Sequence, residues 1–256
     1  MREIVCRSSG LGKRFRIYAR PGDRLLEWLL GGTRHRDRWV LRDVGFSIAA
    51  GEAVGLIGRN GAGKTTLLRV IAGALAKTEG EVFRSPNVVA ISPFGLSLSA
   101  HLSGRENVAA LGRALYLPDL GSREAQDEVA AFAELGEAFD EPTRRYSEGM
   151  KARLAFATFT QSAPALLLID EALTAGDEAF TEKCVQRLIE LRERGTALLL
   201  ATHNPFICYR ICSRVLVLDA GRLVCDTEPH AALATYRDLW TAALSGGQAG
   251  NEGSAS

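Results

Sequence analysis

A glycine-rich segment carries the residues best suited to phosphate chemistry. Residues 58–65 read Gly-Arg-Asn-Gly-Ala-Gly-Lys-Thr and fit the pattern G-x-x-x-x-G-K-[ST] at every fixed position. Glycines let backbone N–H groups approach phosphate oxygens closely, and a helix that begins near Thr65 points its positive dipole end at the same anion. The pattern predicts a nucleotide site in which Lys64 neutralises the β- and γ-phosphates, Thr65 binds Mg²⁺ and Thr66 adds a phosphate contact. The predicted nucleotide-binding residues of this loop are Gly58, Asn60, Gly61, Ala62, Gly63, Lys64, Thr65 and Thr66.

Two adjacent acids supply the partners that such a loop needs. Hydrolysis at a phosphate loop requires a second Mg²⁺ contact and a group that orients the attacking water. Asp170 and Glu171 directly follow an apolar run at 166–169. We therefore expect Asp170 to bind Mg²⁺ and Glu171 to polarise the water that attacks the γ-phosphate.

These residues need a scaffold that brings a loop and a strand end together. Short apolar runs at 53–57, 165–169, 197–201 and 214–218 predict strands that are buried on both faces, as in a parallel sheet. Helices are expected at 65–72 and over the apolar positions Phe180, Cys184, Leu188 and Leu191, which recur at helical spacing. Strand, helix and strand repeated in this way indicate an α/β core.

The segment at about 100–160 differs from this core. Apolar side chains spaced along 129–139 predict one amphipathic helix, and 151–160 predicts a second. We expect a mostly helical subdomain inserted between the first and the later core strands. The tail at 245–256 is rich in Gly, Ser, Ala and Asn and is expected to be disordered.

Composition limits the classes of function. The chain has 256 residues, of which 46% are hydrophobic, and this is enough for a sizeable core. Its 31 basic and 30 acidic residues give a net charge of +1, whereas a nucleic-acid binder is normally more basic. The longest apolar runs are far shorter than the 18 or so residues that span a bilayer. We expect a soluble chain that binds no nucleic acid and contacts a membrane mainly through a partner.

Two further segments, C-terminal to the loop, resemble motifs of one ATPase family. Residues 146–150 read Tyr-Ser-Glu-Gly-Met and resemble the signature turn L-S-G-G-Q of a known ATPase family, matching it at Ser147 and Gly149. Residues 170–177 resemble that family's acid pair and the loop after it, which ends in Asp177.

Two single residues extend the resemblance. His203 follows the strand expected at 197–201 and resembles the family's switch histidine. Trp39 resembles the aromatic residue that stacks on adenine. Over about residues 3–226, the chain is similar to the ATP-binding-cassette (ABC) ATPases.

The resemblance implies a fold and a shared site. It implies one ABC ATPase domain at 3–240, with a P-loop core, a mostly parallel sheet, an N-terminal antiparallel β region and the inserted helical subdomain. It implies ATP and Mg²⁺ as cofactors, with Glu171 and His203 as catalytic residues. A second copy would present Ser147 and Gly149, so that two ATP molecules lie between two head-to-tail chains. Asp177 would also belong to that nucleotide site.

Two positions depart from the family pattern. Glu148 replaces a signature glycine, and we expect its carboxylate to point away from the triphosphate. Residues 92–96 read Ser-Pro-Phe-Gly-Leu where the family has a glutamine that touches Mg²⁺ and the transporter.

The motifs also narrow the branch of the family. The signature, the acid segment and the run Leu-Ser-Gly-Arg-Glu-Asn at 102–107 are together similar to ATPase subunits of bacterial polysaccharide exporters, which move O-antigen, capsule or teichoic-acid chains. This similarity implies a homodimer that works with two copies of a membrane permease, peripheral at the cytoplasmic face of the inner (plasma) membrane. An ATPase of a drug, haem or lipid exporter is one alternative. A soluble ABC ATPase outside transport is another.

A basic N-terminal arm at about 11–38 stands apart from these motifs. It holds many more Lys and Arg than acids, and an apolar cluster lies in its middle: Leu25, Leu26, Trp28, Leu29 and Leu30. The cluster could lie at a membrane surface, with the arginines meeting anionic lipid or glycan pyrophosphate. Alternatively, it forms a helix packed on its own domain.

Overall fold

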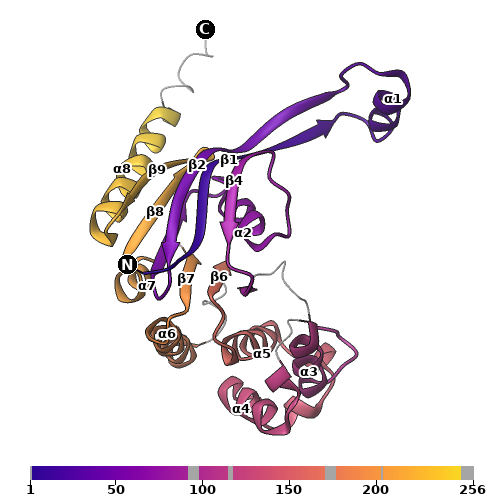
Figure 1. The fold of residues 1–256 in the computed structure, drawn as a ribbon, viewed down its shortest axis with the longest axis vertical. Helices are drawn as coiled ribbons and strands as arrows, with labels where there is room; N and C mark the ends of the chain where they lie inside the picture. Colours follow the sequence, from indigo (N-terminus) through magenta and orange to yellow (C-terminus); the bar gives the residue numbers. More distant parts are fainter. Residues whose placement is uncertain (1, 92–97, 115–117, 171–176, 203, 249–256) are drawn as a thin grey trace.

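Two β-sheets form the body of the molecule (Figure 1). A computed structural model describes residues 2–91, 98–114, 118–170, 177–202 and 204–248. Its strands are β1 (Ile4–Tyr18), β2 (His35–Ala49), β3 (Ala53–Gly58), β4 (Glu79–Arg84), β5 (Val88–Ile91), β6 (Leu166–Asp170), β7 (Ala197–Ala201), β8 (Arg214–Asp219) and β9 (Arg222–Thr227). The larger sheet has the order β5-β6-β7-β3-β8-β9, and the smaller one the order β2-β1-β4.

The larger sheet is parallel from β5 to β8, and only its edge strand β9 and the smaller sheet are antiparallel among the described strands. This confirms the predicted α/β class with a mostly parallel sheet and an N-terminal antiparallel region. The helices are α1 (Asp23–Leu30), α2 (Lys64–Ala72), α3 (Gly104–Ala114), α4 (Arg123–Ala133), α5 (Glu148–Gln161), α6 (Glu178–Glu193), α7 (Pro205–Ile211) and α8 (Pro229–Gln248).

Both faces of the larger sheet are buried, as its continuous apolar strands predict. Along β3, Ala53 and Ile57 pack with residues of α5, α6 and α7. Val54 and Leu56, which point the other way, pack with α2 and the smaller sheet. The phosphate loop therefore lies at the end of a strand that is fixed from both sides.

The helical subdomain has a hydrophobic core of its own, built by α3, α4, α5 and the turns between them, and it lies at one end of the molecule (Figure 1). The helix predicted over 129–139 is shorter than expected. α4 ends at Ala133, where Glu134 takes a left-handed conformation with φ 57°, and a short 3₁₀ helix, η2 (Gly136–Asp140), follows. A left-handed residue at this position ends a helix, because its N–H turns back to the last carbonyls.

The basic arm is a long extension of the β1–β2 hairpin that projects from the body and carries α1 at its tip (Figure 1). No residue of α1 is buried, and Trp28 is 80% exposed. The arm therefore does not pack its apolar cluster on its own domain, and this alternative is wrong.

The C-terminal segment also differs from expectation. α8 runs to Gln248, so residues 245–248 of the predicted disordered tail are helical. Adding a residue to an existing helix costs little, because each one contributes a further hydrogen bond. Residues 249–256 lie outside the described part of the chain. Among the helices that the structure describes, none is long and apolar enough to cross a membrane.

Candidate nucleotide site

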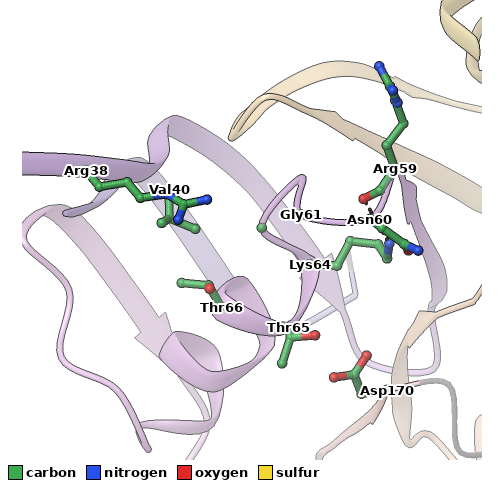
Figure 2. A pocket seen from close by; sticks show the side chains of 10 residues that line it. Arg38, Val40, Arg59, Asn60, Gly61, Lys64, Thr65, Thr66 and Asp170 are labelled. Atoms are coloured by element: carbon green, nitrogen blue, oxygen red, sulfur yellow. Dashed lines mark hydrogen bonds between the residues drawn. The ribbon is translucent and has the colours of Figure 1, made fainter. Parts of the chain in front are cut away.

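A cavity of about 540 Å³ opens where the phosphate loop meets β2 and the end of β6. Figure 2 shows its lining side chains, which come from β2, the phosphate loop, the start of α2 and the end of β6. They are Arg38, Val40, Arg59, Asn60, Gly61, Gly63, Lys64, Thr65, Thr66 and Asp170. Most of the nucleotide-binding residues predicted for the loop therefore meet around one hollow.

Close packing explains why two glycines are needed in the loop. A Cβ on Gly63 would lie 2.9 Å from the Val40 carbonyl oxygen, and its φ of 110° is one that only glycine adopts readily. A Cβ on Gly58 would lie 2.2 Å from the Leu218 carbonyl oxygen of β8. These glycines let the loop turn tightly between β8 and β2, so that its backbone faces the cavity.

Lys64 is held inside the loop. Its side chain is 7% exposed, and Nζ donates hydrogen bonds to the carbonyl oxygens of Gly58 at 2.7 Å and Arg59 at 3.3 Å. These contacts hold the ammonium beside the loop, in the wall of the cavity. A cation in this place can neutralise phosphate oxygens at short range.

Asp170 lines the same cavity as Thr65 and is only 6% exposed. A carboxylate and a hydroxyl are oxygen ligands of the kind that Mg²⁺ takes in proteins, together with substrate phosphates and water. The donor set beside the loop therefore fits a Mg²⁺ that arrives with a triphosphate.

Trp39, the residue predicted to stack on adenine, does not line the cavity. Arg38 and Val40 line the cavity, and Trp39, one residue from each, faces the other side of β2. The guanidinium groups of Arg14 and Arg42 lie over its ring, 5.5 and 5.6 Å from the ring centre. Trp39 is thus part of the arm rather than of the cavity wall.

Phe15, which the sequence motifs did not single out, lies on the same face of the hairpin as Arg38 but is not among the residues that line the cavity. Phe15 pairs directly with Arg38 across β1 and β2, and directly opposed residues share one face of a sheet. Its side chain is 37% exposed. Only the register of the hairpin could have revealed it, and that register shifts three times between Ser8 and Arg14.

The arm face that carries Trp39 holds a continuous run of contacts from α1 to the body. Glu27 of α1 accepts a hydrogen bond from His35 Nδ1 at 2.9 Å, and the other His35 nitrogen lies 3.4 Å from Asp37. Asp37 pairs with Arg14 at 2.8 Å, and Arg14 stacks on Trp39. Hydrogen bonds from His35 and from the Arg34 N–H hold the pKa of Glu27 below its usual range. The run fixes the direction of the tip helix.

The predicted signature residues begin α5 and are not among the residues that line the cavity. Ser147 caps the helix, and its Oγ accepts a hydrogen bond from the Met150 N–H at 3.1 Å. A Cβ on Gly149 would touch only Ser147 Oγ, at 3.8 Å, so the helix end has room for a close ligand. The Glu148 carboxylate is 90% exposed and pairs with Lys151 at 2.7 Å.

The remaining predicted site residues have other positions. Asp177 caps α6 by accepting a hydrogen bond from the Phe180 N–H at 2.8 Å, and its second oxygen pairs with Arg153. Its predicted contact with nucleotide stays a prediction. Glu171, His203 and the segment 92–96 lie outside the described residues.

A glycine loop between a buried strand and a helix, with an acidic strand end in the same cavity, defines a P-loop nucleotide-binding protein of the α/β class. The comparisons with known proteins specify the family. The family described as "ABC transporter" matches residues 41–174. The chain therefore belongs to the ABC transporter family, and its cassette is the ATP-hydrolysing part of that family.

Individual relatives cover most of the chain. It is 35% identical over 239 residues to the ABC transporter protein AbcA of Aeromonas salmonicida, covering 93% of this chain and 78% of that protein. It is 38% identical to the O-antigen export system ATP-binding protein RfbB of Myxococcus xanthus, covering 84% of this chain but 50% of that protein. It is 32% identical to the teichoic acids export ATP-binding protein TagH of Lactococcus lactis subsp. lactis, covering 91% of this chain and 51% of that protein.

A solved structure shares the fold. The dimeric post-hydrolysis state of the ATP-binding cassette MJ0796, bound to ADP and Pi, superposes with a TM-score of 0.73 at 22% identity. The match covers 88% of this chain and 99% of that one.

Proposed function

We propose that this chain is the ATP-hydrolysing subunit that powers export of a lipid-linked polysaccharide, of the O-antigen, capsule or teichoic-acid type, through a separate membrane permease. The cavity that brings Lys64, Thr65 and Asp170 together carries the ATPase part of this proposal. The relatives in O-antigen and teichoic-acid export support its substrate class.

The triphosphate is held by residues of one chain. Loop N–H groups and the Lys64 ammonium bind the β- and γ-phosphates, and the N-terminus of α2 adds its dipole. Thr65 and Asp170 would hold Mg²⁺, which supplies charge neutralisation on the phosphate oxygens. Glu171, next to Asp170 in sequence, would accept a hydrogen bond from the attacking water and so orient it, and His203 would contact the γ-phosphate.

The γ-phosphate side of the site needs a second chain. Ser147 and Gly149 are not part of their own chain's cavity wall, and they begin a helix whose end is open to a ligand. In a head-to-tail homodimer, each copy would present this turn to its partner's loop. ATP then joins the two copies, and hydrolysis releases them. Two copies of the permease would receive this motion, which places the chain at the cytoplasmic face of the inner membrane.

The base is expected to lie against Phe15. Replacing Phe15 with alanine removes one stacking surface, worth on the order of 1 kcal/mol, and should weaken ATP binding about fivefold. Titration with a fluorescent ATP analogue measures this affinity. Trp39→Ala is the matched control, because Trp39 lies on the opposite face of the same hairpin and should leave the affinity unchanged. If only Trp39→Ala weakens binding, the base lies elsewhere.

Co-purification tests the transport assignment. A tagged chain is isolated in mild detergent from the membranes of its native host, in the presence of ATP. A multispanning membrane protein in equal amount is the expected companion. Recovery of the chain alone, or with ribosomes or DNA, contradicts the proposal.

The arm would make a direct membrane contact beside the permease. Its tip helix exposes Leu25, Leu29 and Leu30 together with Trp28, and Arg20 and Arg24 flank them. An apolar face rimmed by arginines suits the interface of an anionic membrane, where the rings and chains enter the headgroup region and the cations meet phosphate.

Removing residues 20–35 should therefore separate two properties. Hydrolysis of ATP by the purified chain should persist, while sedimentation with phosphatidylglycerol vesicles should weaken at least about tenfold, since the buried apolar area is lost. Phe206→Ser, which removes an exposed aromatic residue of α7, is the control. Vesicle binding or export equal to that of the intact chain would rule out a membrane role for α1.

A further inference from the structure

Arg153 joins three helices at the boundary between the helical subdomain and the core. It lies on α5, and its Nη1 donates to Glu134 Oε2 at 3.1 Å, where α4 ends. Its Nη2 donates to Asp177 Oδ2 at 2.8 Å, where α6 begins. One guanidinium group thus bridges two carboxylates, one on each side of the boundary.

Other contacts reinforce the same boundary. Lys183 of α6 donates to Glu134 Oε1 at 2.9 Å and to the Phe132 carbonyl at 2.8 Å. Below these ions, Phe132 packs against Phe156 of α5 and Phe180 of α6, with ring centroids 6.0 and 5.9 Å apart. α4, α5 and α6 therefore meet in one ionic and aromatic cluster.

The carboxylates of this cluster accept hydrogen bonds that favour their charged forms. Asp177 accepts from the Phe180 N–H through one oxygen and from Arg153 through the other. These contacts, the Phe180 N–H first, hold the pKa of Asp177 below its usual range, and the hydrogen bond from Lys183 lowers the pKa of Glu134 in the same way. Glu134 also occupies a left-handed conformation, which places its carboxylate between the two cations.

The position of Arg153 along α5 relates this cluster to the signature turn. Ser147 caps the same helix six residues earlier, or about 9 Å along its axis. The phosphate loop and Asp170 belong to the core. In a head-to-tail dimer, the loop of each chain must meet the signature turn of its partner, and both meetings must occur at once. The angle between α5 and α6 therefore decides whether the two sites can close together.

We propose that Arg153 is a positioning residue that sets this angle, by tying the signature helix to α6 through Asp177 and to α4 through Glu134. The inference rests on the proposed composite site of the dimer. Arg153 touches no residue of the cavity wall in any of its described contacts, so it acts on hydrolysis through geometry and not on ATP binding to a single chain.

Arg105 provides a matched control within the chain. It also bridges two carboxylates, Asp127 and Asp140, each at 2.7 Å, and its side chain is 21% exposed against 19% for Arg153. Each guanidinium lies over a phenylalanine ring, at 4.9 Å for Arg105 on Phe139 and 4.5 Å for Arg153 on Phe180. The partners of Arg105 all belong to the helical subdomain, whereas those of Arg153 span the boundary.

The test compares Arg153→Met with Arg105→Met in the full chain. Both should lower the melting temperature by similar amounts, and neither should change the affinity of the monomer for a fluorescent ATP analogue. Arg153→Met should lower kcat about 10- to 100-fold, the effect expected of a small displacement at a site that must be aligned. Arg105→Met should keep the kcat of the unaltered chain. Glu134→Gln, a milder change at an exposed carboxylate, should lower kcat in the same direction if Arg153→Met does not fold.

Two results would overturn the inference. One is an equal kcat for Arg153→Met and Arg105→Met, with Glu134→Gln also unchanged. The other is a loss of kcat that follows a parallel loss of ATP affinity in the monomer. Lys64→Ala is measured alongside these variants. An active Lys64→Ala chain would mean that the proposed function has failed, whereas an inactive one leaves the two results above to count against the role of Arg153.

Discussion

Lys64→Ala is expected to abolish measurable ATP hydrolysis. Lys64 is buried in the loop, and the Gly58 and Arg59 carbonyls hold its Nζ there. The charge that builds up on the phosphate oxygens during transfer would then lack its nearest cation. Loss of one such preorganised donor lowers turnover by about 100- to 1,000-fold. Release of phosphate from ATP, followed with purified chain, measures this loss.

A control lysine separates this effect from a general change in charge. Lys77 is exposed and donates to the Gly80 carbonyl, away from the cavity. Lys77→Ala should hydrolyse ATP at the rate of the unaltered chain. Full activity of Lys64→Ala would mean that the loop is not the site of phosphate transfer.

Glu171→Gln is expected to retain ATP while slowing its hydrolysis at least about 100-fold. Glutamine has nearly the same shape as glutamate but is not a base, so it orients the attacking water poorly. The phosphate loop and Asp170, which hold the nucleotide, are unchanged. Rapid filtration with radiolabelled ATP measures retention, and single-turnover kinetics measure the chemical step.

Another carboxylate at a strand end serves as the control for this change. Asp219 ends β8 and does not line the cavity. Asp219→Asn should leave the single-turnover rate unaltered. A Glu171→Gln chain that hydrolyses ATP at the normal rate would transfer the role of base to another residue.

Local features of this fold could be predicted from the sequence alone. The loop at 58–65 is specified by its own glycines and by the apolar strand before it, so its place between β3 and α2 follows from neighbouring residues. The buried strands β6, β7 and β8 are equally local, because a short, wholly apolar run has few other places in a folded chain.

Features that depend on pairing between distant residues could not be predicted from the sequence alone. The face on which Trp39 lies is decided by its partner Arg14, twenty-five positions earlier, and by irregularities between β1 and β2 that shift the register. A shift of one residue turns a side chain to the other face, which is why Phe15 and not Trp39 lies on the same face as Arg38. The length of the hairpin, and hence the exposure of α1, is also set by pairing.

The end of α4 shows a third limit. The apolar spacing continues past Ala133, yet the helix stops there, because Glu134 is held between Arg153 and Lys183 in a conformation that a helix excludes. These two cations come from later helices, whereas Gly136, which is also left-handed at φ 52°, is a local sign of a helix end within 129–139.

Mixing two inactive variants tests the shared site most directly. Lys64→Ala spoils the loop of one chain but keeps its signature turn, and Ser147→Arg does the reverse. Each variant alone should be inactive. In an equimolar mixture, a mixed dimer has one intact site, formed by the loop of the second variant and the signature turn of the first, while the introduced arginine faces a loop that holds no ATP. Because half of random dimers are mixed and each has one working site of two, activity should return to about a quarter of normal. A mixture that hydrolyses no more ATP than its separate components would contradict the account.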